Sequence, residues 1–184
     1  MNTNGVLSFG RRFTQSDGYG QHFTSLPSPH IVAPFWDDVD IGAILPSGHP
    51  HPGTISYRIV SDQKILDQVQ VEILEHYPVL GGARPLLVFV ATWDNVALDR
   101  SNSFARNSFQ VYIATDGTWT VVRFSYGNIE WATRVTLIGV SDYTSQRHIT
   151  HPASFNSAAV RQLSGSSVYL RIDDSKYVHV CVNA

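Results

Sequence analysis

The chain has 184 residues, of which 43% are hydrophobic and only 15% are charged, and its formal net charge is -2 with histidine neutral. This length fits one domain with a full hydrophobic core, and the composition excludes intrinsic disorder, which needs low hydrophobicity and high net charge. The 11 arginines and 2 lysines are scattered, so the sequence offers no basic surface for nucleic acid and no polybasic segment for anionic lipid.

Cys181 is the only cysteine, so no disulfide is expected within the chain. Its thiol is expected to be either a buried structural group or one half of a bridge to a cysteine outside this sequence. The apolar run from Pro85 to Trp93 is far too short to span a bilayer. No signal peptide is expected, because neither a basic nor an apolar region follows Met1.

Strand signals dominate the chain and are separated by connectors rich in Pro, Gly and Ser. The segment Leu86–Trp93 is almost continuously apolar, which is typical of a central strand that is buried on both faces. Two β-rich arms between Ser108 and Tyr126 flank Asp116-Gly117, which predicts a hairpin with a two-residue type I′ turn and a positive φ at Gly117. In chain order, the other predicted strands are Val6–Phe9, Thr54–Val60, Val135–Val140, Val168–Ile172 and Tyr177–Val182.

One segment, residues 61–76, predicts a helix. Its apolar residues at 65, 66, 69, 73 and 74 recur at helical spacing. Ser61 is predicted as the N-cap, Asp62 is favourable in the first turn, and Pro78 prevents continuation. The β-branched residues at 69, 71 and 73 fit a strand instead, so both alternatives stay open with the helix favoured.

These elements together predict a mainly β fold. We expect an antiparallel β-sandwich-like domain with one packed α-helix over about residues 61–76. No linker divides the chain, so residues 1–176 are expected to form a single domain and residues 177–184 a tail leading into a following module.

The densest group of acidic residues is Asp37, Asp38 and Asp40, which directly follows the apolar segment ending at Trp36. The pattern Trp-Asp-Asx-Val recurs later, with Asp94 and Asn95 as its polar pair. If the two segments lie side by side, their oxygens suit Ca²⁺, which takes six to eight oxygen ligands.

Two other interpretations of this acidic group stay open. Its carboxylates can accept hydrogen bonds from turn amides where strands end, with the tryptophans in the core, or they can act as a glycosidase pair. The structural interpretation is favoured, so the sequence predicts no catalytic residue, and Trp36 and Trp93 are predicted to be buried. No cofactor is expected apart from this possible Ca²⁺.

Several ordered motifs carry a family resemblance. The segment Ile31-Val-Ala-Pro-Phe-Trp-Asp-Asp-Val-Asp40 resembles the opening signature of the extracellular NIDO (nidogen-like) domain family. Later segments resemble further family motifs in the family's order: Gly53–Arg58, Val90–Val96, Asn107–Val111, Ala114–Gly117, Phe124–Trp131 and Val168–Asp173. The loops Leu45–Pro52 and Val79–Arg84 depart from the family pattern.

The resemblance implies an extracellular role in cell–matrix adhesion or matrix assembly, without enzymatic activity and with an extracellular protein or glycan as the partner. It also implies that the chain is a fragment of a larger secreted or membrane-anchored protein, although the chain itself holds no membrane span. The alternative function is a carbohydrate-binding β-sandwich, and glycosidase-type catalysis is a third. Sugar binding would require Trp119 or Trp131 to face solvent as a stacking platform.

Overall fold

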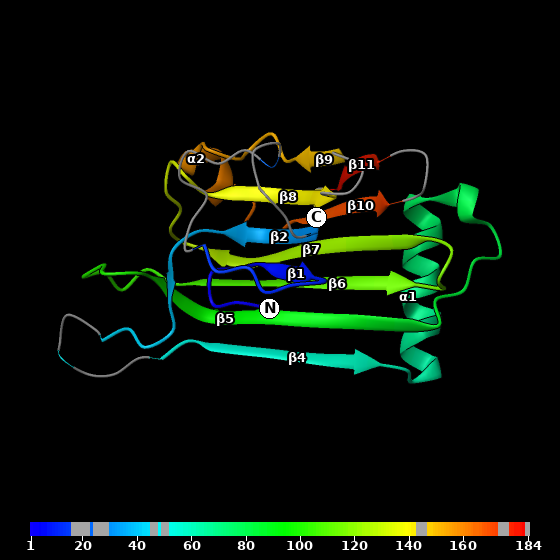
Figure 1. The fold of residues 1–184 in the computed structure, drawn as a ribbon, viewed down its shortest axis with the longest axis horizontal. Helices are drawn as coiled ribbons and strands as arrows, with labels where there is room; N and C mark the ends of the chain where they lie inside the picture. The colour runs from blue at the N-terminus through cyan, green and yellow to red at the C-terminus, as the bar shows by residue number, and fades with distance from the viewer. Residues whose placement is uncertain are drawn as a thin grey trace.

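The computed structural model describes residues 1–15, 23, 30–44, 48, 52–142, 147–172 and 177–182, the last of these as backbone only. The predicted fold class is confirmed: two antiparallel sheets stack face to face, and one long helix packs on the outer face of the larger sheet (Figure 1). None of the helices in these residues is long and apolar enough to cross a membrane.

The smaller sheet has four strands in the order β1-β2-β8-β9, which are β1 (Leu7–Phe9), β2 (His30–Trp36), β8 (Leu137–Asp142) and β9 (Arg147–Thr150). The larger sheet has seven strands. Six of them follow the order β11 (Tyr177–Val182), β10 (Ser167–Ile172), β7 (Thr120–Ile129), β6 (Asn107–Thr115), β5 (Leu87–Leu98) and β3 (Val39–Asp40). The seventh, β4 (Thr54–Val60), pairs with the first part of β5, whereas β3 pairs with its end.

The main core lies between the two sheets. Strands β5, β6 and β7 alternate their side chains, as the period of two requires, so that Trp93, Phe109 and Phe124 face the smaller sheet. Trp93 and Phe109 stack with ring centroids 5.2 Å apart, and Phe35 of β2 stacks on Phe109 at 5.1 Å. The predicted burial of Trp36 and Trp93 is confirmed, since both are 0% exposed.

The opposite face of the larger sheet carries α1 (Gln63–His76), so the helical alternative for this segment is confirmed. Its buried residues Leu66, Val69 and Ile73 pack against Val88, Ala114, Trp119 and Val121 of the sheet side. Ser61 is not the cap: the Asp62 side chain accepts a hydrogen bond from the Ile65 amide at 3.2 Å. A short 3-10 helix, η2 (Pro78–Leu80), follows α1, and a second helix, α2 (Ser157–Arg161), precedes β10.

The β6–β7 hairpin was predicted with the wrong loop. Thr115 pairs with Thr120, so the loop has four residues, 116–119, in place of two. Asp116 Oδ1 accepts hydrogen bonds from the Thr118 and Trp119 amides at 2.8 and 3.1 Å, and Trp119 is buried under α1. The positive φ at Gly117 is confirmed at 94°.

The other predicted strands are present with small shifts of their ends. The Thr54–Val60 and Tyr177–Val182 predictions coincide with β4 and β11. Strand β5 is longer than predicted because it continues through an irregular register between Trp93 and Val96 to Leu98. The backbone of β11 pairs with β10 along its whole length, so residues 177–182 extend the larger sheet.

Candidate interaction surface

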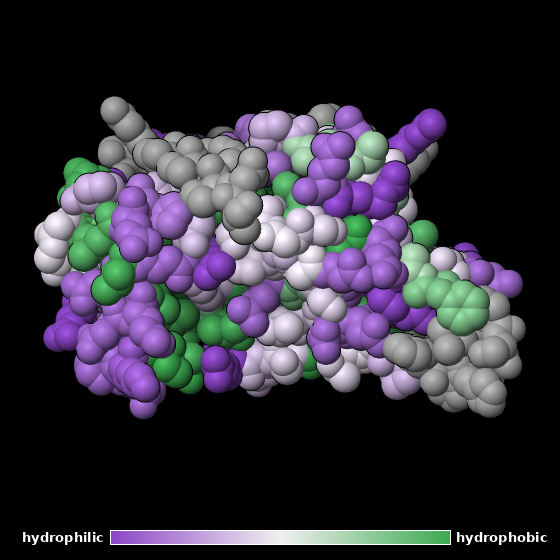
Figure 2. All heavy atoms as spheres, turned by 180° about the vertical axis from the view of Figure 1, so that it is seen from behind, coloured by the Kyte–Doolittle hydropathy of each residue, from purple (hydrophilic) through white to green (hydrophobic). Residues whose placement is uncertain are grey.

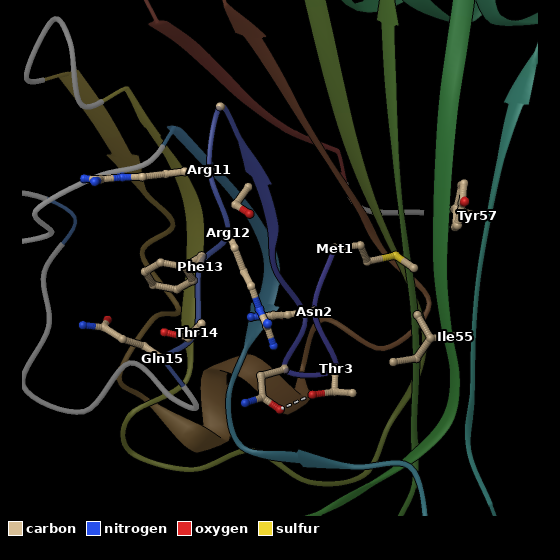
Figure 3. A pocket seen from close by; sticks show the side chains of 13 residues that line it. Met1, Asn2, Thr3, Arg11, Arg12, Phe13, Thr14, Gln15, Ile55 and Tyr57 are labelled. Atoms are coloured by element: carbon tan, nitrogen blue, oxygen red, sulfur yellow. Dashed lines mark hydrogen bonds between the residues drawn. The ribbon is translucent and has the colours of Figure 1, made fainter.

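A groove of about 820 Å³ lies between the N-terminal segment and β4 (Figure 3). It forms because the smaller sheet, with β1 at its edge, does not extend over β4, which is the outermost strand in Figure 1. The groove is lined by residues 1–4, Ser8, residues 10–15, Ile55 and Tyr57.

The β4 side of this groove is apolar. Ile55 and Tyr57 point from β4 toward the N-terminal segment, and Tyr57 is 68% exposed. The Tyr57 ring lies nearly parallel to the half-buried Phe89 ring of β5, with centroids 6.0 Å apart. Ile59 follows two residues later on the same face of the strand and is also 68% exposed. This face therefore offers aromatic and aliphatic surface to solvent.

The opposite wall of the groove is polar and is anchored to the core. The Trp93 indole Nε1 donates to the Asn2 carbonyl at 3.1 Å, and the Val6 amide donates to Asn2 Oδ1 at 3.0 Å. Gly5 has φ 75°, and a Cβ there would overlap the Phe35 carbonyl oxygen, so the chain passes this point only with glycine. The exposed Arg12 side chain reaches toward Asn2 across the wall (Figure 3).

A second, smaller hollow of about 420 Å³ opens between the two sheets near the ends of β8 and β10. Its lining is largely apolar, with Val122, Val140 and Ile172 among its residues. At its rim His30 Nδ1 and Asp142 Oδ1 are 2.8 Å apart. This hollow lies in the sandwich interior, whereas the first groove follows an outer strand.

The predicted acidic group is divided by the structure. Asp37 is 1% exposed, and its carboxylate accepts hydrogen bonds from the Asp38 amide, the Thr133 amide and both the Thr133 and Thr136 hydroxyls. Asp37 therefore fastens the β2–β3 junction to the loop between β7 and β8. Four donors within the fold therefore satisfy this carboxylate.

The remaining candidates lie nearer the surface. Asp40 Oδ1 accepts a hydrogen bond from the Gly42 amide at 2.7 Å, which confirms the prediction of an Asx-type turn for at least one carboxylate. Asp38 is half-buried, and the Asp99 amide donates to its carbonyl oxygen at 2.8 Å. Asp94 is exposed and accepts a hydrogen bond from the Ser108 hydroxyl at 2.7 Å.

Asn95 completes the predicted set and occupies the left-handed region with φ 57°. Its amide donates to Ser108 Oγ at 3.0 Å. Across the residues that the structure describes, no group of three or more His, Cys, Asp or Glu side chains is placed to hold a metal ion. The Cys181 side chain lies outside the described residues.

The tryptophans proposed as sugar platforms are both in the core. Trp119 is 7% exposed and Trp131 is 6% exposed, so neither ring is available for stacking on a ligand. Trp131 Nε1 donates to the Val96 carbonyl at 3.0 Å, and the Asn107 side chain holds the Trp131 backbone through hydrogen bonds at 2.9 and 3.1 Å. The motif residues Asn107 and Trp131 therefore fix the loop after β7.

A polar contact between α1 and the larger sheet was not anticipated from the sequence. Glu72 of α1 accepts hydrogen bonds from the Tyr112 and Tyr169 hydroxyls and pairs with Arg123 at 2.9 Å. Burial, together with the Glu72 charge and hydrogen bond, raises the pKa of both tyrosines above their usual value. His76 stacks on Tyr169 with centroids 3.8 Å apart. The one local sequence signal for this contact is that Glu72 directly precedes the buried Ile73 on α1.

The rest of the outer face of the larger sheet is polar. Seen from behind, hydrophilic and neutral side chains cover much of the surface beside α1 (Figure 2). On this face Gln110 Nε2 donates to Thr92 Oγ1 at 2.8 Å.

Burial opposes ionisation of Asp116 at the hairpin tip, but hydrogen bonds from Thr118 and Trp119 outweigh it and lower the pKa of that carboxyl.

Comparison with known proteins agrees with the resemblance inferred from the motifs. Alpha-tectorin of Mus musculus is 29% identical over 157 residues, which cover 85% of this chain and 7% of the relative. Alpha-tectorin of Gallus gallus is 27% identical over 161 residues, which cover 87% of this chain and 7% of the relative. Nidogen of Drosophila melanogaster is 28% identical over 153 residues, which cover 79% of this chain and 10% of the relative.

The chain thus spans a tenth or less of the length of these curated relatives. No solved structure matches it significantly. The model of the nidogen-like domain, NIDO, matches residues 1–180, which is almost the whole chain. On this evidence the chain belongs to the nidogen-like (NIDO) domain family.

Proposed function

We propose that this chain is a non-enzymatic interaction module of an extracellular protein, and that it binds a matrix protein through the groove between the N-terminal segment and β4. The observation that carries the proposal is the exposed Tyr57 ring beside Ile55, facing a polar wall that is tied to the core through Asn2. Exposed aromatic residues are enriched where proteins bind one another, and apolar surface rimmed by polar groups is typical of such sites.

Several features favour a binding role over catalysis and a protein over a glycan. The most buried candidate carboxylate, Asp37, is fully engaged by four hydrogen-bond donors within the fold. Trp119 and Trp131 are unavailable for sugar stacking because both are buried. What β4 exposes is a strand with aliphatic and aromatic side chains, which suits an extended polypeptide.

This chain matches a tenth or less of the length of the curated relatives, which supports a role for it as one module of a longer protein. The module, whose larger sheet includes β11, acts as part of a longer extracellular chain. The partner is an extracellular matrix component that binds the surface of the folded chain.

The proposal is tested by measuring how the labelled chain binds to cell-deposited matrix from which the cells have been removed. Wild type should bind saturably, and Tyr57→Ser should weaken binding about tenfold, which is the size of effect expected for a central aromatic contact. Arg12→Ser, on the facing wall, should weaken it to a smaller degree. The matched control is Val79→Ser on η2, which removes another exposed apolar side chain away from the groove.

Each variant is first shown to be folded by its urea midpoint, because both residues replaced in the groove are exposed and contribute little to the core. Equal binding of wild type, Tyr57→Ser and Arg12→Ser would contradict the proposal. Binding that is lost equally in the Val79→Ser control would contradict it as well.

A further inference from the structure

In the part of the chain that the structure describes, the outer edge of β4 has no strand paired with it. Among the described strands only β5 pairs with residues 54–60, and it does so over seven consecutive residue pairs without a bulge. Natural edge strands usually carry proline, lysine, a bulge or a cover that prevents pairing with another chain. The segment TISYRIV has no proline, lysine or glycine, and Arg58 is its one charged side chain.

The two faces of β4 differ in a regular way. Ile55, Tyr57 and Ile59 lie on the face that continues toward the groove, with Tyr57 over Phe89. The alternate residues Ser56 and Arg58 lie on the other face. The apolar set is centred on Tyr57, which is also the middle residue of the strand.

From this symmetry we infer that β4 is a self-association site, at which β4 of a second copy of this chain pairs antiparallel with it and joins the two larger sheets. The two-fold axis passes beside Tyr57, so Tyr57 lies opposite its own copy and Ile55 lies opposite Ile59 of the second copy. Such an interface uses the same surface on both subunits, as two-fold dimers do.

The register follows from the residue pattern. Only pairing centred on Tyr57 uses all seven residues of both strands and keeps Ile55, Tyr57 and Ile59 opposite one another. A shift by one residue would place Ile55, Tyr57 and Ile59 opposite Arg58, Ser56 and Thr54, because side chains alternate with a period of two. The two copies then present their apolar faces on the same side of one continuous sheet.

The charges on β4 permit this register. Arg58 is the only charged residue of the strand, and it lies opposite the uncharged Ser56 of the second copy. No hydrogen bond or ion pair engages Arg58 within the described part of the chain. Asp94 of β5 pairs with Thr54 of β4. It therefore provides a carboxylate on the same face of the sheet as Arg58, on the strand next to the seam. No pair of like charges lies directly across it, which is the arrangement that would oppose pairing.

The partner here is a second copy rather than the matrix protein of the proposed function, so this inference goes beyond that function and does not depend on it. A seven-residue strand seam is small, and small interfaces are weak, so we expect dimers at micromolar concentrations and above. Tethering several copies to one matrix would strengthen such weak pairing through effective concentration.

The sharpest test uses cysteine at the predicted axis. In a Cys181→Ser background, which removes the one native thiol, Tyr57→Cys places two thiols directly opposite each other. Directly opposite residues of antiparallel strands have Cα atoms about 4.5–5.5 Å apart, within the range of a disulfide. Air oxidation should therefore give a covalent dimer on a non-reducing gel.

Ser56→Cys in the same background is the matched control, because residue 56 lies opposite residue 58 of the second copy. Its two thiols are then diagonal neighbours, too far apart for efficient bridging. Val79→Cys, another exposed position away from β4, measures random collision. Cross-linking of Tyr57→Cys well above both controls supports the inference, and equal cross-linking at the three positions overturns it.

Sedimentation of the unmodified chain gives the second measurement. Between about 1 and 300 µM, the range in which weak dimers form, the mass should rise from 20.4 kDa toward twice that value. Tyr57→Lys should stay monomeric because it places two ammonium groups opposite each other, while Val79→Lys should behave as wild type. A monomer at every concentration overturns the inference and leaves matrix binding untouched, whereas dimers without matrix binding refute the proposed function alone.

Discussion

Two segments of this molecule share the pattern Trp-Asp-Asx-Val, one beginning at Trp36 and the other at Trp93, and their aspartates have opposite environments. Both tryptophans are 0% exposed, and the valines that close the segments are buried as well. Asp37, however, is buried and bonded to Thr133 and Thr136, whereas Asp94 is exposed and bonded only to Ser108 among the described residues.

The difference arises from how each strand is interrupted. Strand β2 ends at Trp36 and the chain turns before β3 begins at Val39, which directs Asp37 inward toward the loop after β7. Strand β5 instead continues through its segment, with an irregular register between Trp93 and Val96 and Asn95 in the left-handed region. The irregularity is typical of a β-bulge, which re-aims side chains without ending the strand.

The two segments also lie close together, because Val39 and Asp40 of β3 pair with Leu98 and Ala97 of β5. The two backbones therefore lie side by side, but among the described residues no group of three or more His, Cys, Asp or Glu side chains is placed to hold a metal ion. The comparison teaches that one short pattern specifies a buried tryptophan in both places, while the surrounding strands decide what the neighbouring aspartate does.

The largest effect is expected for the two buried tryptophans, which are the feature that both segments share. Trp36→Ala and Trp93→Ala should each lower the free energy of unfolding by about 3–5 kcal/mol, because each removes a fully buried aromatic side chain. Urea denaturation followed by circular dichroism measures the change. Loss below about 1 kcal/mol for either variant, the range of a surface substitution, would contradict the equal anchoring of the two segments.

The next prediction separates the aspartates. Asp37→Ala should lower the free energy of unfolding by about 2–4 kcal/mol, because the hydroxyls of buried Thr136 and half-buried Thr133 and the Asp38 amide all lose Asp37 as their acceptor. Asp94→Ala should cost less than about 1 kcal/mol, since its single described hydrogen bond is exposed.

Both aspartate variants are compared by the same urea titration. Thr136→Val provides the matched control, because it removes one of the four donors to Asp37 and should cost less than Asp37→Ala. Equal losses for Asp37→Ala and Asp94→Ala would refute the distinction between the two sites.

A smaller change in the free energy of unfolding is expected at Asn95, where the register of β5 is irregular. Asn95→Val should cost about 1–2 kcal/mol, because a β-branched residue is strained at a positive φ. Asn95→Gly should be close to neutral, since glycine adopts that conformation without strain. Thermal melting of both variants checks the sign, and a valine variant as stable as the glycine variant would show that the backbone here is not constrained.

The smallest expected effect concerns calcium. The midpoint of thermal unfolding should be the same in millimolar CaCl₂ and in EDTA, because the oxygens of Asp37 are occupied by protein donors and the Asp40 carboxylate by the Gly42 amide. A ligand that binds only the folded chain raises the midpoint by mass action. If calcium raised the midpoint of thermal unfolding and Asp94→Asn abolished that rise, the cation site would be established instead.

Much of the fold could be predicted from local patterns. The limits of β4 follow from its β-branched and aromatic residues between turn signals, and the helix follows from the spacing of Leu66, Val69 and Ile73. The length of the β6–β7 loop could not be predicted in this way. Asp116-Gly117 favours a two-residue turn locally, but burial of Trp119 beneath α1 requires the longer loop.

The site was less accessible to prediction for a related reason. The donors to Asp37 lie 96 and 99 positions away along the chain, so no local spacing connects them with the carboxylate. The groove beside Tyr57 likewise needs the N-terminal segment to pass over β5, which depends on the hydrogen bond between Trp93 and Asn2. The apolar face of β4 is exposed because the smaller sheet ends before it. The periodicity of the sequence does not predict where a sheet ends.

The distribution of the tryptophans has a practical consequence for magnetic resonance. Trp36, Trp119 and the pair Trp93 and Trp131 belong to three separate apolar clusters. The indoles of the pair donate to carbonyls, whereas those of Trp36 and Trp119 have no hydrogen-bond partner in the described part of the chain. Four indole N–H signals should therefore form two kinds of probe, and local opening beneath α1 should shift or broaden the Trp119 signal while the other three stay in place.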